Sequence, residues 1–176
     1  MRIAARNGIN SAAVTLVLFA LVAPVLGAEE PSGCDKFKWP IDRARAALTA
    51  PDRTRLASGT ELAAIPSGGA TLALVEAAQA KLPRTPQRAP KGGTFAGFAN
   101  FKNPPKPGMY TISLSAGAWV DVIQDGHFLK PVAFSGATDC SGIRKTIKYE
   151  LGTSPFILQI SGAHDAQLSV AILPSE

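Results

Sequence analysis

Apolar and polar side chains alternate from Tyr110 to Leu114 with the period of two that is typical of a half-buried β-strand. Tyr110, Ile112 and Leu114 share one face, and hydroxyl side chains take the other. A helix would place these three residues on different sides of its axis. The pattern therefore predicts a strand, and the break at Ala116-Gly117 predicts its end.

A second strand is expected over residues 118–124, followed by Asp125-Gly126, a dipeptide that favours a type I′ hairpin turn. A two-residue turn at this point places four pairs opposite each other: Gln124 and His127, Ile123 and Phe128, Asp121 and Lys130, and Trp119 and Val132. The third pair predicts a cross-strand ion pair. Val120, Val122 and Leu129 are expected together on the apolar side of the hairpin.

Similar alternation predicts further strands over residues 94–101, 143–151, 156–161 and 168–172. Residues 70–82 fit two interpretations, because they are good helix formers and yet Leu72 and Leu74 share one strand face with Ala78, Ala80 and Leu82. We interpret this stretch as a strand. The sequence thus predicts a mainly β protein, an antiparallel, jelly-roll-like β-sandwich of about seven to eight strands with a short N-terminal helix.

The helix is expected between Pro40 and Ala50, where Ile41, Ala44 and Leu48 follow helical spacing. Residues 52–59 are interpreted as a polar connector. Phe37 and Trp39, just before the helix, are expected to dock this segment on the sandwich, with ligand stacking as the alternative.

Residues 1–28 have the pattern of a signal peptide: a positive start with Arg2 and Arg6, an apolar stretch, and small residues ending at Ala28. We expect a periplasmic or secreted protein without a transmembrane segment after cleavage. Three regions follow: the signal peptide at 1–28, an N-terminal helical and linker segment at 29–69, and a β-sandwich domain at 70–176. Loss of the leader lowers the formal net charge from +5 to +3, so the basic composition does not indicate nucleic-acid binding.

The expected mature chain retains two cysteines, Cys34 and Cys140. An exported protein meets an oxidising compartment, where a disulfide is the simplest use of such a pair. A redox thiol or a metal ligand is the alternative, but there is no Cys-x-x-Cys spacing to support it. We predict a Cys34–Cys140 disulfide.

The stretch between Pro83 and Pro107 holds six prolines and no acidic residue. Six cations lie in or beside it: Lys81, Arg84, Arg88, Lys91, Lys102 and Lys106. With phenylalanines interleaved, these cations are the candidate binding residues for an anionic polysaccharide, an envelope surface or another exported protein. The alternative is that they are solvated charges that keep strand edges apart.

His127 and His164 are the two histidines of the chain, and neither lies in a ligand-spaced motif. Both follow or occupy expected turns, where Asp and His commonly bond to the backbone. No Gly-x-Ser-x-Gly motif presents a nucleophile. We therefore expect a non-catalytic binding or interaction module without catalytic residues, metal or cofactor, and keep a small secreted enzyme or metal-binding protein as the alternative.

The segments CDKFKWPIDRARAAL, FAGFANF, GMYTISLSAGAWVDVIQDG, CSGIRKTIKYEL and FILQISGA resemble small secreted alphaproteobacterial proteins of unknown function. Some proteins of this kind bear the label homogentisate 1,2-dioxygenase, an activity that needs two histidines and a carboxylate converging on iron. The two histidines here do not have that spacing. The Gly-x-Tyr strand and the hairpin are more loosely similar to jelly-roll domains of secreted bacterial peptidases, which implies a fold and no activity.

Overall fold

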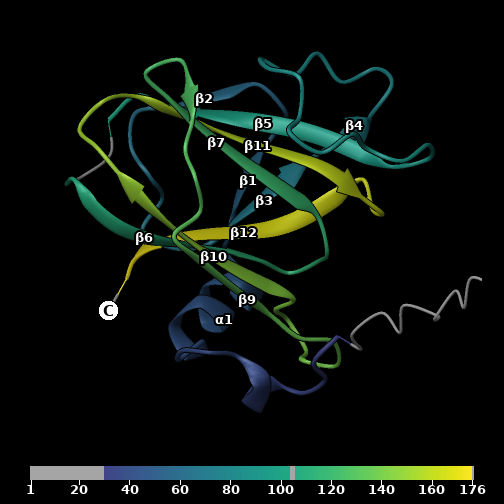
Figure 1. Ribbon diagram of the computed structural model, residues 1–176, viewed down its shortest axis with the longest axis vertical. Helices are drawn as coiled ribbons and strands as arrows, with labels where there is room; N and C mark the ends of the chain where they lie inside the picture. The colour runs from purple at the N-terminus through teal and green to yellow at the C-terminus, as the bar shows by residue number, and fades with distance from the viewer. Residues whose placement is uncertain (1–29, 104–105, 176) are drawn as a thin grey trace, which may run out of the picture.

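Two β-sheets pack face to face, and one short helix lies on the outer side of one of them (Figure 1). The computed structural model describes residues 30–103 and 106–175. Its elements are η1 (Cys34–Lys36), α1 (Asp42–Thr49), β1 (Thr54–Leu56), β2 (Thr60–Leu62), β3 (Ala70–Ala73), β4 (Val75–Glu76), β5 (Phe95–Phe101), β6 (Gly108–Leu114), β7 (Trp119–Gln124), β8 (His127–Phe128), β9 (Ala133–Gly136), β10 (Lys145–Leu151), β11 (Phe156–Ala163) and β12 (Gln167–Pro174). The predicted β-sandwich with an N-terminal helix is confirmed.

Each sheet has six strands. Sheet 1 has the order β1-β3-β12-β6-β10-β9, and sheet 2 has the order β2-β5-β11-β7-β8, with β4 also paired to β5. All pairs are antiparallel except β1 with β3 and β2 with β5. The strand number exceeds our expectation because several strands have only two to four residues.

The stretch that was expected to be a polar connector, residues 52–59, contains β1 and leads into β2. These two strands precede residue 70 and join opposite sheets. Each has three residues, too few for an alternation to be recognised, and each pairs in parallel with a strand that lies later in the chain.

The main core fills the space between the sheets with the residues whose alternation was recognised in the sequence. Leu158 and Ile160 of β11, like Ile112 and Leu114 of β6, are fully buried there. Across the β5–β11 pair the rings of Phe101 and Phe156 stack with their centroids 4.7 Å apart. Val120, Val122 and Leu129 all pack on this core, as expected from the hairpin pattern.

A second, smaller core joins α1 to the outer face of sheet 1. Ile41, Ala44 and Leu48 pack there against Ile143 and Ala171. The predicted disulfide is confirmed: Cys34 and Cys140 are bonded with an S–S distance of 2.02 Å. It closes the same small core, so the N-terminal segment is covalently tied to the loop that precedes β10.

The hairpin turn is confirmed, but its expected register ends early. Asp125 and Gly126 have φ values of 52° and 75°, as a type I′ turn requires. The pairs Gln124–His127 and Ile123–Phe128 are present.

The other two expected pairs are wrong, because the chain leaves sheet 2 after β8. Leu129 N still donates to Val122 O at 2.8 Å, whereas Val132 N donates to Lys148 O of sheet 1, also at 2.8 Å. Lys130 is exposed on this crossing, and Asp121 is buried with other partners. The expected Asp121–Lys130 ion pair therefore does not form, and Val132 does not face Trp119.

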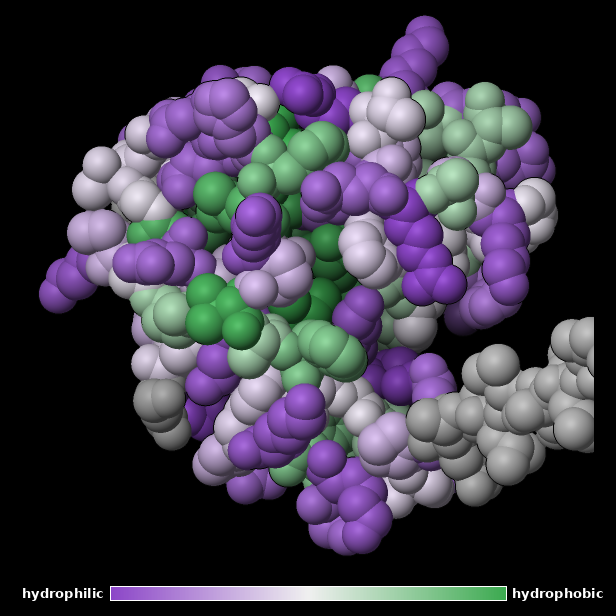
Figure 2. Space-filling view, viewed as in Figure 1, coloured by the Kyte–Doolittle hydropathy of each residue, from purple (hydrophilic) through white to green (hydrophobic). Residues whose placement is uncertain are grey.

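The crossing exposes apolar side chains along one side of the sandwich. Val132 is 58% exposed and Phe134 of β9 is 63% exposed. Figure 2 shows apolar atoms gathered across the middle of this face, where the chain passes from β8 to β9.

The strand expected over residues 70–82 is only partly correct. The chain forms β3 in sheet 1 and β4 in sheet 2, and a turn begins at residue 77. Leu72 and Leu74 point into the core as expected. The backbone N–H groups of Gln79 and Ala80 bond back to Glu76 O, so the remaining alanines belong to this turn rather than to a strand.

The expected signal peptide, residues 1–28, lies outside the described residues. Within the described part of the chain, no helix is long and apolar enough to cross a bilayer.

Candidate functional site

A proline-rich segment, residues 81–91, crosses the outer face of sheet 2 between β4 and β5 (Figure 1); we call it the basic strap. Its main chain is held by two side chains of the sheet. Arg84 N donates to Gln159 Oε1 at 3.3 Å, and Gln87 N donates to Asp121 Oδ2 at 3.2 Å. The side chains of the strap cations are consequently left in solvent, and all four of these residues, Lys81, Arg84, Arg88 and Lys91, are exposed.

Asp121 is the residue that fixes the strap. It is 1% exposed, and its carboxylate accepts from three donors: Gln87 N, Trp119 Nε1 at 2.8 Å and Gln159 Nε2 at 3.4 Å. Bonding to these donors offsets the cost of burying the carboxylate. A proline-rich segment cannot form a regular strand, so side-chain acceptors beneath it supply the bonds that a ladder would supply.

The strap arginines lie over aromatic rings of sheet 2. The Arg84 guanidinium lies 5.5 Å from the centroid of Phe128 and donates to Gly126 O at 2.9 Å. The Arg88 guanidinium lies 5.8 Å from the centroid of Trp119. These contacts leave both cations at the surface and restrict where they point.

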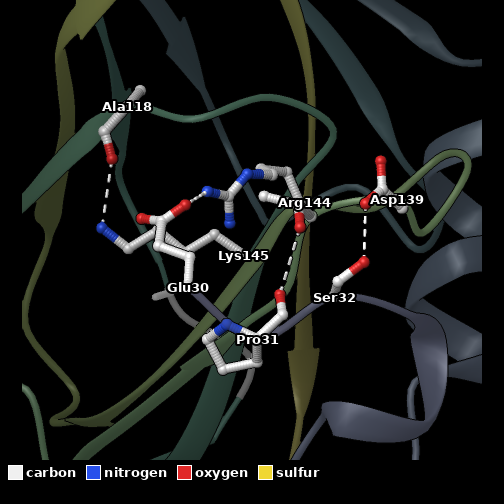
Figure 3. A network of polar contacts seen from close by, with 8 residues as sticks. Glu30, Pro31, Ser32, Ala118, Asp139, Arg144 and Lys145 are labelled. Atoms are coloured by element: carbon white, nitrogen blue, oxygen red, sulfur yellow. Dashed lines mark hydrogen bonds and ion pairs between the residues drawn. The ribbon is translucent and has the colours of Figure 1, made fainter. Parts of the chain in front are cut away.

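A cation from sheet 1 also lies close to the indole of Trp119. Lys145 of β10 lies 5.6 Å from the centroid of Trp119 and donates to Ala118 O at 3.1 Å (Figure 3). The preceding residue, Arg144, lies beside it (Figure 3). Arg88 and Lys145 at Trp119, together with Arg144 beside Lys145, form what we call the cation cluster.

The other cations of the cluster repel the charged ammonium of Lys145. Burial lowers the pKa of the Lys145 ammonium below its usual value, and the charges of Arg88 and Arg144 lower that pKa further. The carboxylate of Glu30 acts in the opposite direction and raises it. A group of cations with this mutual repulsion favours an added anion.

The N-terminal segment lies against the cluster (Figure 3). Glu30 forms an ion pair with Arg144. The next residues are fixed to the loop before β10, because Thr138 N donates to Pro31 O at 2.8 Å and Ser32 Oγ donates to Asp139 Oδ2 at 2.6 Å. The disulfide follows two residues after Ser32.

The cation contacts at Phe128 and those at Trp119 lie at opposite ends of β7. Phe128 pairs with Ile123, four residues along the strand from Trp119. At about 3.4 Å per residue these two positions are about 14 Å apart. The surface is therefore an extended row rather than a closed pocket.

The structure separates the six predicted binding cations. Arg84 and Arg88 belong to this row, and Lys81 and Lys91 lie at the ends of the strap. Lys102 follows β5 and forms an ion pair with Glu61 of β2 at 3.0 Å. Lys106 precedes β6, and its carbonyl oxygen accepts from Tyr110 Oη at 2.7 Å.

Sequence reasoning missed Arg144 and Lys145 as members of the site. Both residues fall in the strand expected over residues 143–151, and nothing in the pattern shows that the start of this strand reaches Trp119 of sheet 2. The adjacent Arg-Lys pair at the start of a strand was the available signal.

The histidines do not assemble a site. His127 is exposed in β8 opposite Gln124, and His164 is exposed in the turn before β12. Among residues 30–103 and 106–175, no group of three or more His, Cys, Asp or Glu side chains could hold a metal ion.

The two aromatic residues before α1 differ in their packing. Phe37 packs on the small core. Trp39 is half-buried, with the Lys148 ammonium 4.7 Å from its ring centroid, beside a groove of about 190 Å³ between α1 and sheet 1.

We found no match between the chain and any protein-family model, and no significant similarity to a curated protein or to a solved structure. The resemblance to secreted alphaproteobacterial proteins stays a prediction.

Proposed function

We propose that this protein is an exported, non-catalytic binding module that holds an anionic polysaccharide along the basic strap and the cation cluster. The observation on which the proposal depends is the indole of Trp119 with Arg88 and Lys145 both within 6 Å of its centroid. Cations that adjoin an aromatic ring offer charge to an acidic group and an apolar surface to a sugar ring.

The sequence around the site supports a negatively charged ligand, because the surface itself is positive. No acidic residue occurs between Glu76 and Asp121, while six cations do. Asp121 itself is buried beneath the strap and bonded to three donors. The outer face at this point therefore presents cations without neighbouring exposed carboxylates of the same stretch.

The shape of the surface favours a polymer. The contacts at Phe128 and Trp119 are spread over about 14 Å of strand β7, a distance that suits successive units of an extended chain. An isolated small anion would need only one end of this row. The confirmed disulfide is typical of oxidising compartments, which supports export.

Binding to polygalacturonate and to dextran sulfate, measured by calorimetry at several salt concentrations, tests the proposal. Affinity should fall steeply between low and physiological salt, because exposed charges are screened over about 8 to 10 Å. Replacing Arg84, Arg88 and Lys91 together by Ser should weaken binding by about tenfold or more, at about 0.5 kcal/mol for each contact.

The matched control replaces Lys36, Lys38 and Arg55 by Ser. These three cations are also exposed, but Lys36 and Lys38 lie in or just after η1, and Arg55 lies in β1 of the opposite sheet. The control has the same net charge as the test variant and should keep nearly full affinity. Equal losses in both variants would show that only net charge matters. Binding to anionic lipid vesicles without binding to either polymer would refute the choice of polysaccharide.

A further inference from the structure

Glu30 is an acidic group that the described N-terminal residues bring to the cation cluster. It forms an ion pair with Arg144, and its charge reaches Lys145 (Figure 3). Asp121, the other nearby carboxylate, is buried and fully engaged with neutral donors. Glu30 therefore occupies the position at which the cluster would meet an acidic group of a ligand.

This placement is fixed by several separate contacts. Pro31 O accepts from Thr138 N, Gly33 N donates to Thr138 O at 2.9 Å, and Ser32 Oγ donates to Asp139. The disulfide at Cys34 secures the end of the segment. The Glu30 side chain itself remains 66% exposed, so it can leave Arg144 without disturbing a core.

We propose that Glu30 is a built-in competitor of the anionic ligand, whose carboxylate occupies the cation cluster until an acidic group of the polysaccharide displaces it. The inference depends on the proposed function, because it concerns the same surface. It assigns to the N-terminal segment, residues 30–33, the role of setting the affinity of the cluster.

The test compares Glu30→Gln with Glu61→Gln. Each variant loses one negative charge, and Glu61 is paired with Lys102 away from the cluster. Removing the competitor should raise the affinity for polygalacturonate by up to about fivefold, the range of one exposed ion pair. Glu61→Gln should leave that affinity nearly unchanged.

A charge-neutral variant separates competition from simple charge. Ser32→Ala removes the bond to Asp139 and should loosen the segment, so affinity should rise by about twofold while net charge stays constant. An NMR titration of the Lys145 side chain gives a readout without ligand. Its pKa should fall in Glu30→Gln and stay constant in Glu61→Gln, because Glu30 raises it in the native protein.

The possible results have distinct meanings. Higher affinity in Glu30→Gln alone supports the inference, even if the unaltered protein binds only weakly. Equal affinity in Glu30→Gln and Glu61→Gln, with binding by the unaltered protein, overturns the inference and leaves the proposed function standing. Absence of binding by all variants overturns both.

Discussion

The indole nitrogen of Trp119 donates a 2.8 Å hydrogen bond to Asp121, two residues further along the same strand. Alternate residues of a strand share a face, so both side chains lie on the outer side of sheet 2. The bond sets the orientation of the indole towards which Arg88 and Lys145 point. The same carboxylate anchors the strap through Gln87 N, so one buried side chain organises both parts of the candidate site.

Replacing Asp121 by Asn should therefore destabilise the protein and loosen the strap. All three partners of the carboxylate are donors, so the amide must place its own donor against one of them. We expect a loss of about 1 to 3 kcal/mol in the free energy of unfolding, measured by urea denaturation. Tryptic cleavage after Arg84 and Arg88 should become faster in the folded protein.

Asp165→Asn is the control, because Asp165 is exposed in the turn before β12. Its free energy of unfolding should stay within about 0.5 kcal/mol of that of the unaltered protein. Equal stability of the two variants would contradict the anchoring role of Asp121.

The buried face of each long strand could be predicted because burial against the main core imposes a period of two. Ile147, Tyr149 and Leu151 follow it in β10, and Phe156 and Leu158 follow it in β11. The turn and the disulfide could be predicted because each depends on specific residue types: an Asp-Gly dipeptide and a pair of cysteines in an exported chain.

The candidate site could be predicted only in part, because it depends on which segment covers the outer face of a sheet. The register of the two-residue turn placed Asp121 opposite Lys130, and nothing periodic in residues 81–91 indicated that this segment lies over Asp121. Lys145 reaches Trp119 from the other sheet, a long-range relationship that strand patterns do not contain.

Gly126→Ala should destabilise the hairpin through backbone strain alone. Gly126 has a φ of 75°, and an added Cβ would meet nothing within 4 Å, so no steric contact contributes. A left-handed conformation costs a residue with a Cβ about 1 to 2 kcal/mol. Gly117→Ala is the control, because a Cβ at Gly117 would also meet nothing within 4 Å and the φ of Gly117 is not left-handed. Thermal unfolding should show a loss for the first variant only, and equal behaviour of both would argue against strain.

Replacing Cys34 and Cys140 together by Ser should lower stability substantially. The bond joins residues separated by 106 positions, and closing such a loop restricts the unfolded chain by about 4 to 5 kcal/mol in the entropic model. Urea denaturation should show a large part of this loss. Reducing agent should destabilise the unaltered protein and leave the double variant unaffected. A double variant as stable as the oxidised protein would show that the bond contributes nothing to the fold.

Tyr149 should make the protein lose stability at alkaline pH. The side chain is 2% exposed and donates to Val120 O at 3.2 Å; burial, and secondarily the charge of Asp121, raises the pKa of its phenol above the ordinary value near 10. The unfolded chain therefore loses this proton near pH 10 while the folded chain keeps it. The stabilising contribution is complete below pH 10 and declines above it, by up to about 1.4 kcal/mol per pH unit.

Tyr149→Phe should be less stable at neutral pH by about 1 kcal/mol, because it lacks the hydrogen bond. It should also lack the alkaline loss of stability that the Tyr149 phenol causes. The control is Tyr110→Phe, at the position paired with Tyr149 across β6 and β10. This variant should still show the alkaline loss of stability that the Tyr149 phenol causes. Urea denaturation at pH 8, 10 and 11 measures the difference, and parallel alkaline declines in the unaltered protein and Tyr149→Phe would show that this phenol ionises without unfolding.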